Sequence, residues 1–161
     1  MTANATERAE QSKQPTDAEA ITFPSVAWFR ALADEAAADE ARYRRLGVTE
    51  ITLALRVGAE GFRLVFVDFG CADVSSWDGT APVDCVIAAS AEDWRELVEH
   101  IRERGNADAY HTLNSLVLAG DRFHLEGDEQ LGVDAFYRFN ATLQAYIEEA
   151  AKVPTVFAGA T

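Results

Sequence analysis

The pattern that most restricts the fold lies in residues 51–69, where two apolar segments flank a turn bounded by glycines. In residues 51–57, large apolar side chains alternate with Thr, Ala and Arg, which is the period of a strand with one buried face. Gly58-Ala-Glu-Gly61 then provides a hairpin turn. Residues 62–69 are apolar at nearly every position, so we expect both faces of this second strand to be covered, or one face to meet an interior pocket.

Helical patterns flank the hairpin. Before it, apolar residues at three- and four-residue spacing predict one helix from Val26 to about Leu46, with Ser25 as its N-cap. After it, a serine cap with acidic residues in the first turn predicts a helix from Ser90 to Gly105. The remaining expectations are a loop over 70–81, a strand over 82–89, a short helix over 107–118, a strand over 122–126 and a last helix from 133 to about 150.

These elements fit a single α/β domain. The 161 residues suffice for one hydrophobic core, and the sequence contains no internal repeat. Residues 1–20 lack hydrophobic periodicity, so we expect a disordered N-terminal tail there. The expected domain covers residues 21–153, and residues 154–161 are expected to form a C-terminal tail.

Charge and cysteine content limit the classes of partner. The formal net charge is −13 and no basic patch interrupts it, so we expect no nucleic-acid binding. No apolar stretch approaches the roughly 18 residues of a membrane span, and the N-terminus does not resemble a secretory signal. Cys71 and Cys85 lie in or beside apolar runs and are expected to be free thiols. We therefore expect a cytoplasmic protein.

The sequence contains no residue spacing that is typical of a metal site, a nucleotide-binding loop or a covalent catalytic site. The glycines are scattered among turns, so no phosphate-binding loop is predicted. His100, His111 and His124 lie in three different elements, and neither cysteine has a ligand at metal-binding spacing. We therefore predict no metal and no cofactor, with His100 and His124 at the surface.

Three segments resemble the sterol carrier protein type 2-like family. Residues 23–29, Phe-Pro-Ser-Val-Ala-Trp-Phe, resemble the opening helix of its bacterial members. Residues 84–94 are similar to its strand that leads into a Ser-x-Glu-Asp helix cap, and residues 116–128 to its Gly-Lys-Leu-x-x-x-Gly-Asp strand. The resemblance covers about residues 23–150. Residues 70–81 form a long insertion, and residues 102–110 replace a short turn of the family.

The resemblance implies an α+β fold in which helices pack on one face of a small, mostly antiparallel twisted sheet and enclose a hydrophobic tunnel. It implies a binder of a hydrophobic small molecule such as a lipid, a fatty acyl chain or a sterol, without a cofactor. The residues agree, because helices with aromatic stripes over an apolar strand can enclose such a pocket. The expected lining residues are Phe66, Trp94, Val98, Leu113, Phe123, Phe136, Phe139 and Leu143.

Two other functions remain open from the sequence. The first is a cofactor-independent isomerase or cyclase acting on a polyketide-like or steroid-like substrate. Its candidate acid–base residues are Asp73, Asp78, Tyr110 and His111. The second is a protein-interaction module in which the acidic surface and residues 153–161 engage another chain. The sequence also leaves open whether the protein is a monomer or a homodimer.

Overall fold

Strands β2 (Thr49–Val57) and β3 (Glu60–Asp68) form the hairpin expected from the apolar pattern of residues 51–69. The computed structural model describes residues 20–159, so most of the expected N-terminal tail, residues 1–19, lies outside the described residues. In the hairpin, Leu53 pairs with Leu64, and both side chains are buried on the face that packs against the helices. The alternation in β2 therefore marks its buried face as predicted.

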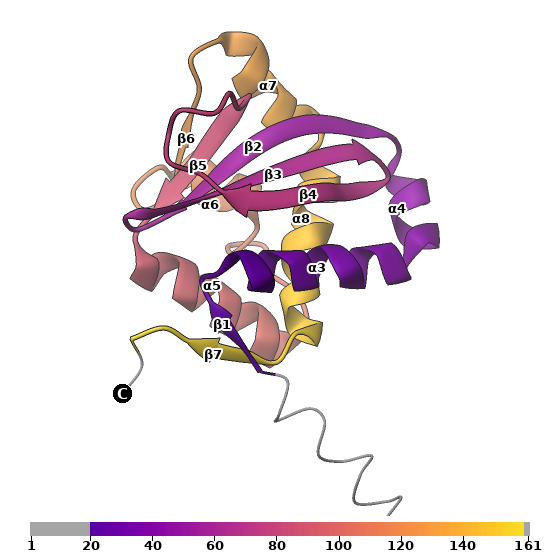
Figure 1. The fold of residues 1–161 in the computed structure, drawn as a ribbon, viewed down its shortest axis with the longest axis vertical. Helices are drawn as coiled ribbons and strands as arrows, with labels where there is room; N and C mark the ends of the chain where they lie inside the picture. Colours follow the sequence, from indigo (N-terminus) through magenta and orange to yellow (C-terminus); the bar gives the residue numbers. More distant parts are fainter. Residues whose placement is uncertain (1–19, 160–161) are drawn as a thin grey trace, which may run out of the picture.

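The hairpin lies at the centre of a five-stranded sheet with the order β4-β3-β2-β5-β6. The other strands are β4 (Gly70–Ser76), β5 (Cys85–Ala89) and β6 (His124–Glu126). β5 pairs parallel to β2, and the other three pairings are antiparallel. This mixed, mostly antiparallel sheet with helices packed against it confirms the α+β fold class (Figure 1).

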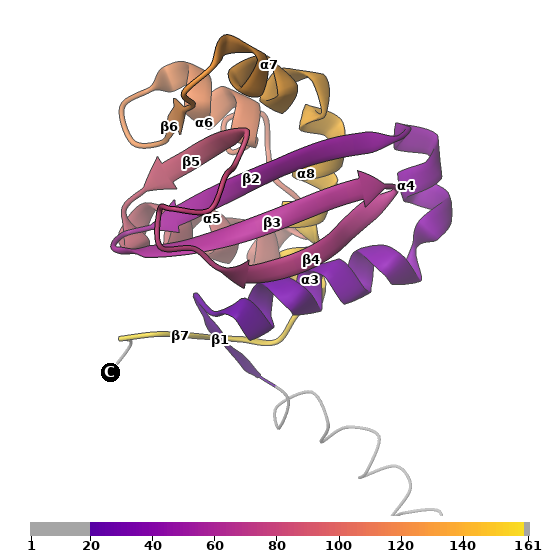
Figure 2. The ribbon, with the colours of Figure 1, turned by 45° about the horizontal axis from the view of Figure 1, so that its top comes forward.

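The helices gather on one side of the sheet, so that α5 and α8 lie behind it in Figure 2. Ser90 caps the N-terminus of α5 by accepting a hydrogen bond from the Asp93 N–H, and Gly105 ends this helix in a left-handed conformation. Both ends of α5 therefore match the sequence signals. The helical elements are α3 (Val26–Ala38), α4 (Glu40–Leu46), α5 (Ala91–Arg104), α6 (Leu113–Ala119), α7 (Gln130–Arg138), α8 (Asn140–Glu148) and the 3-10 turn η1 (Glu149–Lys152).

Two helices expected to be continuous are broken. The single helix expected from Val26 to Leu46 divides at Asp39, whose φ of −118° and ψ of 55° lie outside the helical region. The break turns the chain so that Ala36 of α3 and Tyr43 of α4 both pack against Ala145 of α8. The last helix begins at Gln130, earlier than expected, and divides at Phe139 into α7 and α8.

Residues 70–81, expected to be a loop, begin with edge strand β4. Most of its residues are polar or small, and only Val74 is buried, so the strand lacks the apolar alternation that would have predicted it. The loop after β4 then crosses the outer face of the sheet, where the Pro82 carbonyl accepts a hydrogen bond from Arg63 Nε at 3.1 Å (Figure 2).

The expectation that both faces of residues 62–69 are covered holds for one face only. Phe62, Leu64 and Phe66 of β3 are buried against the helices. On the opposite face, Val67 is 47% exposed. The continuous apolar run therefore does not mark a strand enclosed on both faces.

The two ends of the described chain meet in a separate two-stranded parallel sheet. Strand β1 (Ile21–Phe23) pairs with β7 (Thr155–Phe157), which lies in the range expected as a C-terminal tail. The indole N–H of Trp28 donates to Thr155 Oγ1 at 2.9 Å, and the ring of Phe157 packs edge-on against Phe23. These contacts tie β7 to α3 and to the core.

Candidate functional site

An apolar void of about 10 Å³ lies between the inner face of the sheet and helices α5, α6 and α8. A volume of this size is at the lower limit for one water molecule, so the expected tunnel is closed in this conformation. The strands contribute Leu53, Leu55, Leu64 and Ile87 to its lining, and the helices contribute Trp94, Leu113, Leu143, Tyr146 and Ile147.

Three of the eight predicted lining residues, Trp94, Leu113 and Leu143, border this void. The others lie in the same hydrophobic core without touching the void. Phe139, at the break between α7 and α8, is only partly buried there. The buried members of this second group are Phe66, Val98, Phe123 and Phe136.

The strand residues around the void were missed by the sequence prediction. Leu53 and Leu55 belong to the alternating face of β2, and Ile87 occupies the matching position on β5 through its pairing with Leu55. The alternation had identified the buried face of β2. That signal was available, but it does not say which buried side chains border a void and which fill the rest of the core.

Among the described residues, the lining of the void offers no free polar group. Trp94 and Tyr146 are its two residues with a polar side-chain atom, and both atoms are engaged. The indole N–H of Trp94 donates to the Arg56 carbonyl at 2.9 Å, and Tyr146 Oη donates to the Phe29 carbonyl at 2.7 Å. Burial raises the pKa of Tyr146 well above its ordinary value, which keeps the phenol neutral. The void is therefore suited to an apolar group and not to proton transfer.

Helix α6 covers one side of the void with Leu113, and Leu116 follows it into the core. The helix has only seven residues and lies between its Thr112 cap and Gly120. Its first N–H, from Leu113, donates to Gln144 Oε1 of α8 at 2.8 Å. The cover of the void on this side is therefore a seven-residue segment that this hydrogen bond joins to α8.

The residues proposed for acid–base catalysis do not meet at an apolar pocket. Tyr110 is 82% exposed, and Asp73 and Asp78 are exposed in and after β4. A hydrogen bond from the Thr80 side chain lowers the pKa of Asp78, so this carboxylate is a weaker base than an ordinary aspartate. His111 is partly buried, but on the outer side of α5.

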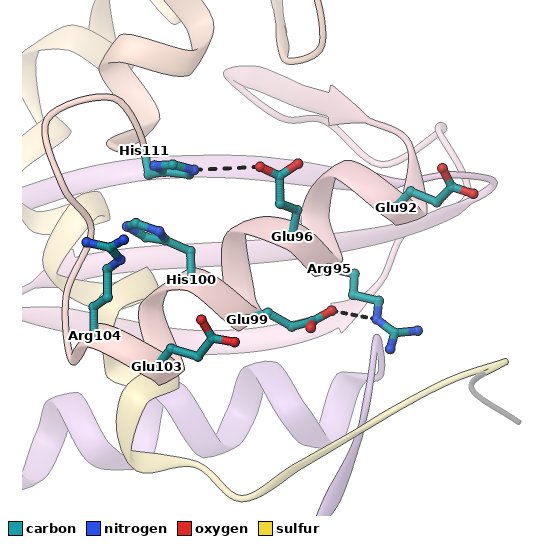
Figure 3. A pocket seen from close by; sticks show the side chains of 8 residues that line it. All are labelled: Glu92, Arg95, Glu96, Glu99, His100, Glu103, Arg104 and His111. Carbon is teal, nitrogen blue, oxygen red and sulfur yellow. Dashed lines mark hydrogen bonds and ion pairs between the residues drawn. The ribbon is translucent and has the colours of Figure 1, made fainter.

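His111 instead borders a polar hollow of about 540 Å³ along α5 (Figure 3). Its ring stacks on that of His100, with the centroids 3.7 Å apart and the planes 13° from parallel. His100 was expected at the surface, but its side chain is only 9% exposed because the loop before α6 folds over it. His124 lies exposed on β6, as predicted. The rest of the hollow is lined by Glu92, Arg95, Glu96, Glu99, Glu103 and Arg104.

Comparison with known proteins identifies the fold. No protein-family model and no curated protein sequence matches the chain. Among solved structures, a crystal structure of sterol carrier protein 2 matches with a TM-score of 0.58 and 20% sequence identity, over 79% of this chain and 95% of that one. A conserved hypothetical protein of Thermus thermophilus, described as a candidate sterol carrier protein, matches with a TM-score of 0.55 and 19% identity. That match spans 81% of this chain and 88% of the other. The chain therefore has the sterol carrier protein 2 fold, and the family resemblance is confirmed at this level.

The structure also bears on membrane association. Within residues 20–159, no helix combines the length and the apolar character that crossing a bilayer requires.

Proposed function

We propose that this protein binds an apolar small molecule of the lipid type between the inner face of its sheet and helices α5, α6 and α8. The observation that carries the proposal is the lining of the void at that place, which offers no free polar side-chain group. The fold supports it, because one protein with the same fold is a sterol carrier protein. The nature of the ligand beyond its apolar character is left to experiment.

Binding requires the void to open, because about 10 Å³ holds no lipid. Helix α6 is the element whose displacement would open it, since Leu113 forms one wall and only a short helix has to move. Trp94, Leu113 and Leu143 would contact the ligand first. The other predicted lining residues, Phe66, Val98, Phe123, Phe136 and Phe139, would join the lining as the space widens.

The expected affinity follows from this closed state. Burying roughly 300 Å² of ligand surface contributes about 7 kcal/mol. The free energy needed to displace α6 reduces that value, so we expect dissociation constants in the micromolar range or weaker.

Titration of delipidated full-length protein with 11-(dansylamino)undecanoic acid tests the proposal. We expect a saturable, blue-shifted emission with one site per chain, and displacement of the probe by oleate. Absence of saturable binding to protein with native circular dichroism would refute the proposal.

Variants of Leu113 locate the site. Leu113→Ala removes one wall of the void and should strengthen probe binding, whereas Leu113→Phe fills the void and should weaken it. The matched control is Leu118→Ala on the same helix, where the side chain is 68% exposed and should not affect binding. If Leu113→Phe fails to fold, stronger probe binding by Leu113→Ala together with unchanged binding by Leu118→Ala still decides the location.

A further inference from the structure

Three side chains of the types that bind metals come together between the end of α5 and the loop before α6. His100 lies near the end of α5, and Asp108 and His111 lie in the loop that precedes α6. One potential ligand atom from each of the three lies within 4.8 Å of those from the other two. The spacing of the residues along the chain matches no metal motif, so only the folded loop reveals this cluster.

The backbone of the loop places Asp108 between the two imidazoles. Its Oδ1 accepts hydrogen bonds from the N–H groups of Tyr110 and His111, at 2.9 and 3.0 Å, which fixes the turn. The same oxygen lies 2.8 Å from His111 Nδ1, and Oδ2 lies 3.7 Å from His100 Nε2. The carboxylate therefore already faces a nitrogen atom of each ring.

Both imidazoles are suited to bind an ion. His100 Nε2 accepts a hydrogen bond from the Asp108 N–H at 3.1 Å, so this nitrogen carries a lone pair and no proton, and an ion that binds there has to replace this hydrogen bond. His111 Nε2 faces the hollow, with Glu96 Oε1 at 3.6 Å as a fourth potential donor (Figure 3).

The hollow beside the cluster is lined by more acidic than basic side chains, which favours a cation. Glu96, Glu99 and Glu103 of α5 line the same hollow, and the whole chain carries a net charge of −13. Arg104 borders the hollow beside His100. Arg122 holds Glu96 Oε2 at 2.8 Å, which leaves Glu96 Oε1 directed at His111.

We propose that His100, Asp108 and His111 form a binding site for a divalent transition-metal ion such as Zn²⁺, and that the ion ties the loop before α6 to α5. Two imidazole nitrogens and a carboxylate oxygen are donors that suit Zn²⁺, Ni²⁺ or Cu²⁺, and they discriminate against Mg²⁺ and Ca²⁺. Because the rings are stacked nearly parallel, one ion cannot lie in both ring planes. Binding therefore requires one imidazole to turn about its χ2 and the stacking to be lost.

Calorimetric titration of metal-free full-length protein with Zn²⁺ at pH 7.5 tests this site. The measurement uses a Cys71→Ser background, which removes the more accessible thiol. We expect one ion per chain and a higher midpoint of thermal unfolding with Zn²⁺ present. His100→Asn, Asp108→Asn and His111→Asn should each weaken binding by about tenfold or more, as loss of one donor or its orienting partner does. The matched control is His124→Asn, because His124 is exposed on β6, outside the cluster.

Three results would overturn the proposal. They are Zn²⁺ binding that is unchanged in His111→Asn, binding of Mg²⁺ or Ca²⁺ as strong as that of Zn²⁺, and no binding at all. The second result would mean that the glutamates of α5 bind divalent cations and that the histidines are not ligands. Proton NMR of the unsubstituted protein gives a further test, which does not depend on the folding of variants. Zn²⁺ should shift the ring proton resonances of His100 and His111 together and leave those of His124 unchanged.

Discussion

Tyr43 of α4 donates a 2.6 Å hydrogen bond to Oε2 of Glu149, a carboxylate buried completely between α4, α8 and η1. The other oxygen, Oε1, lies 3.1 Å from Lys152 Nζ. A buried carboxylate depends on such partners, because its desolvation is costly. This contact therefore connects the early helical region of the chain to its C-terminal end.

Tyr43→Phe should lower the free energy of unfolding by about 2 kcal/mol, because it leaves a buried carboxylate oxygen without its donor. Urea denaturation at pH 7 followed by circular dichroism measures the change. Tyr110→Phe is the matched control: Tyr110 is 82% exposed, so the effect should be below about 0.5 kcal/mol. Equal stabilities of the two variants would contradict a structural role for this hydrogen bond.

Gly132→Ala should destabilise the protein although alanine favours helices. Gly132 lies in α7, and a Cβ at this position would overlap the Asp84 carbonyl oxygen. The gain of about 1 kcal/mol in helix propensity cannot offset that overlap. The comparison is Gly70→Ala, where a Cβ meets no heavy atom within 4 Å. A thermal midpoint of Gly132→Ala at or above that of Gly70→Ala would contradict the close packing.

Thr155→Val should cost about 1–2 kcal/mol, because it removes the acceptor for the indole N–H of the fully buried Trp28. The change keeps the side-chain shape, so the loss reports the two hydrogen bonds of the hydroxyl group, from Trp28 and to the Val153 carbonyl, and not packing. Thr22→Val on the paired strand β1, where the side chain is exposed, serves as control. Guanidinium denaturation should separate the two variants, and coincident curves would argue against β7 as a stabilising strand.

Stability should fall steeply above pH 9. Burial raises the pKa of the Cys71 and Cys85 thiols from 9.0 to about 12, and it raises that of Tyr43 and Tyr146 as well. Between pH 9 and 12 the unfolded chain therefore loses protons that the folded chain retains, which lowers the free energy of the unfolded state relative to the folded state.

Urea midpoints at pH 8 and 10.5 measure this effect, for which we expect a loss of at least about 2 kcal/mol. A Cys71→Ala, Cys85→Val variant should show a shallower decrease over the same interval, because two of the four groups are gone. A decrease as steep as in the unsubstituted protein would assign the pH dependence to other groups.

Much of the fold was predictable because it rests on local patterns. The alternation in residues 51–57 and the turn at Gly58 placed the central hairpin, and the Ser90 cap placed the start of α5. Strand β4 was missed because an edge strand with one buried side chain carries little hydrophobic signal. The breaks at Asp39 and Phe139 depend on how the two halves of each helix pack elsewhere, which periodicity does not encode.

The candidate sites were harder to predict than the fold. Hydrophobic patterning identifies buried residues such as Trp94 and Leu113, but the volume left between them depends on the detailed packing of all side chains. The stacked pair of His100 and His111 arises from the path of one loop, whose turn is held by the Asp108 side chain. Neither feature has a signature in residue spacing.

The pairing of β1 with β7 also determines where the folded region can be extended or joined. Ile21 lies opposite Thr155 and donates its N–H to the Pro154 carbonyl at 2.9 Å, but the strands are parallel, so the polypeptide enters this pair at one end and leaves it beyond Phe157 at the other. A peptide that connects these two points has to run back along the pair, and a circularly permuted chain could then open in an exposed loop such as residues 78–80. A fluorophore at each end would report fraying of this junction by loss of energy transfer before the central sheet unfolds.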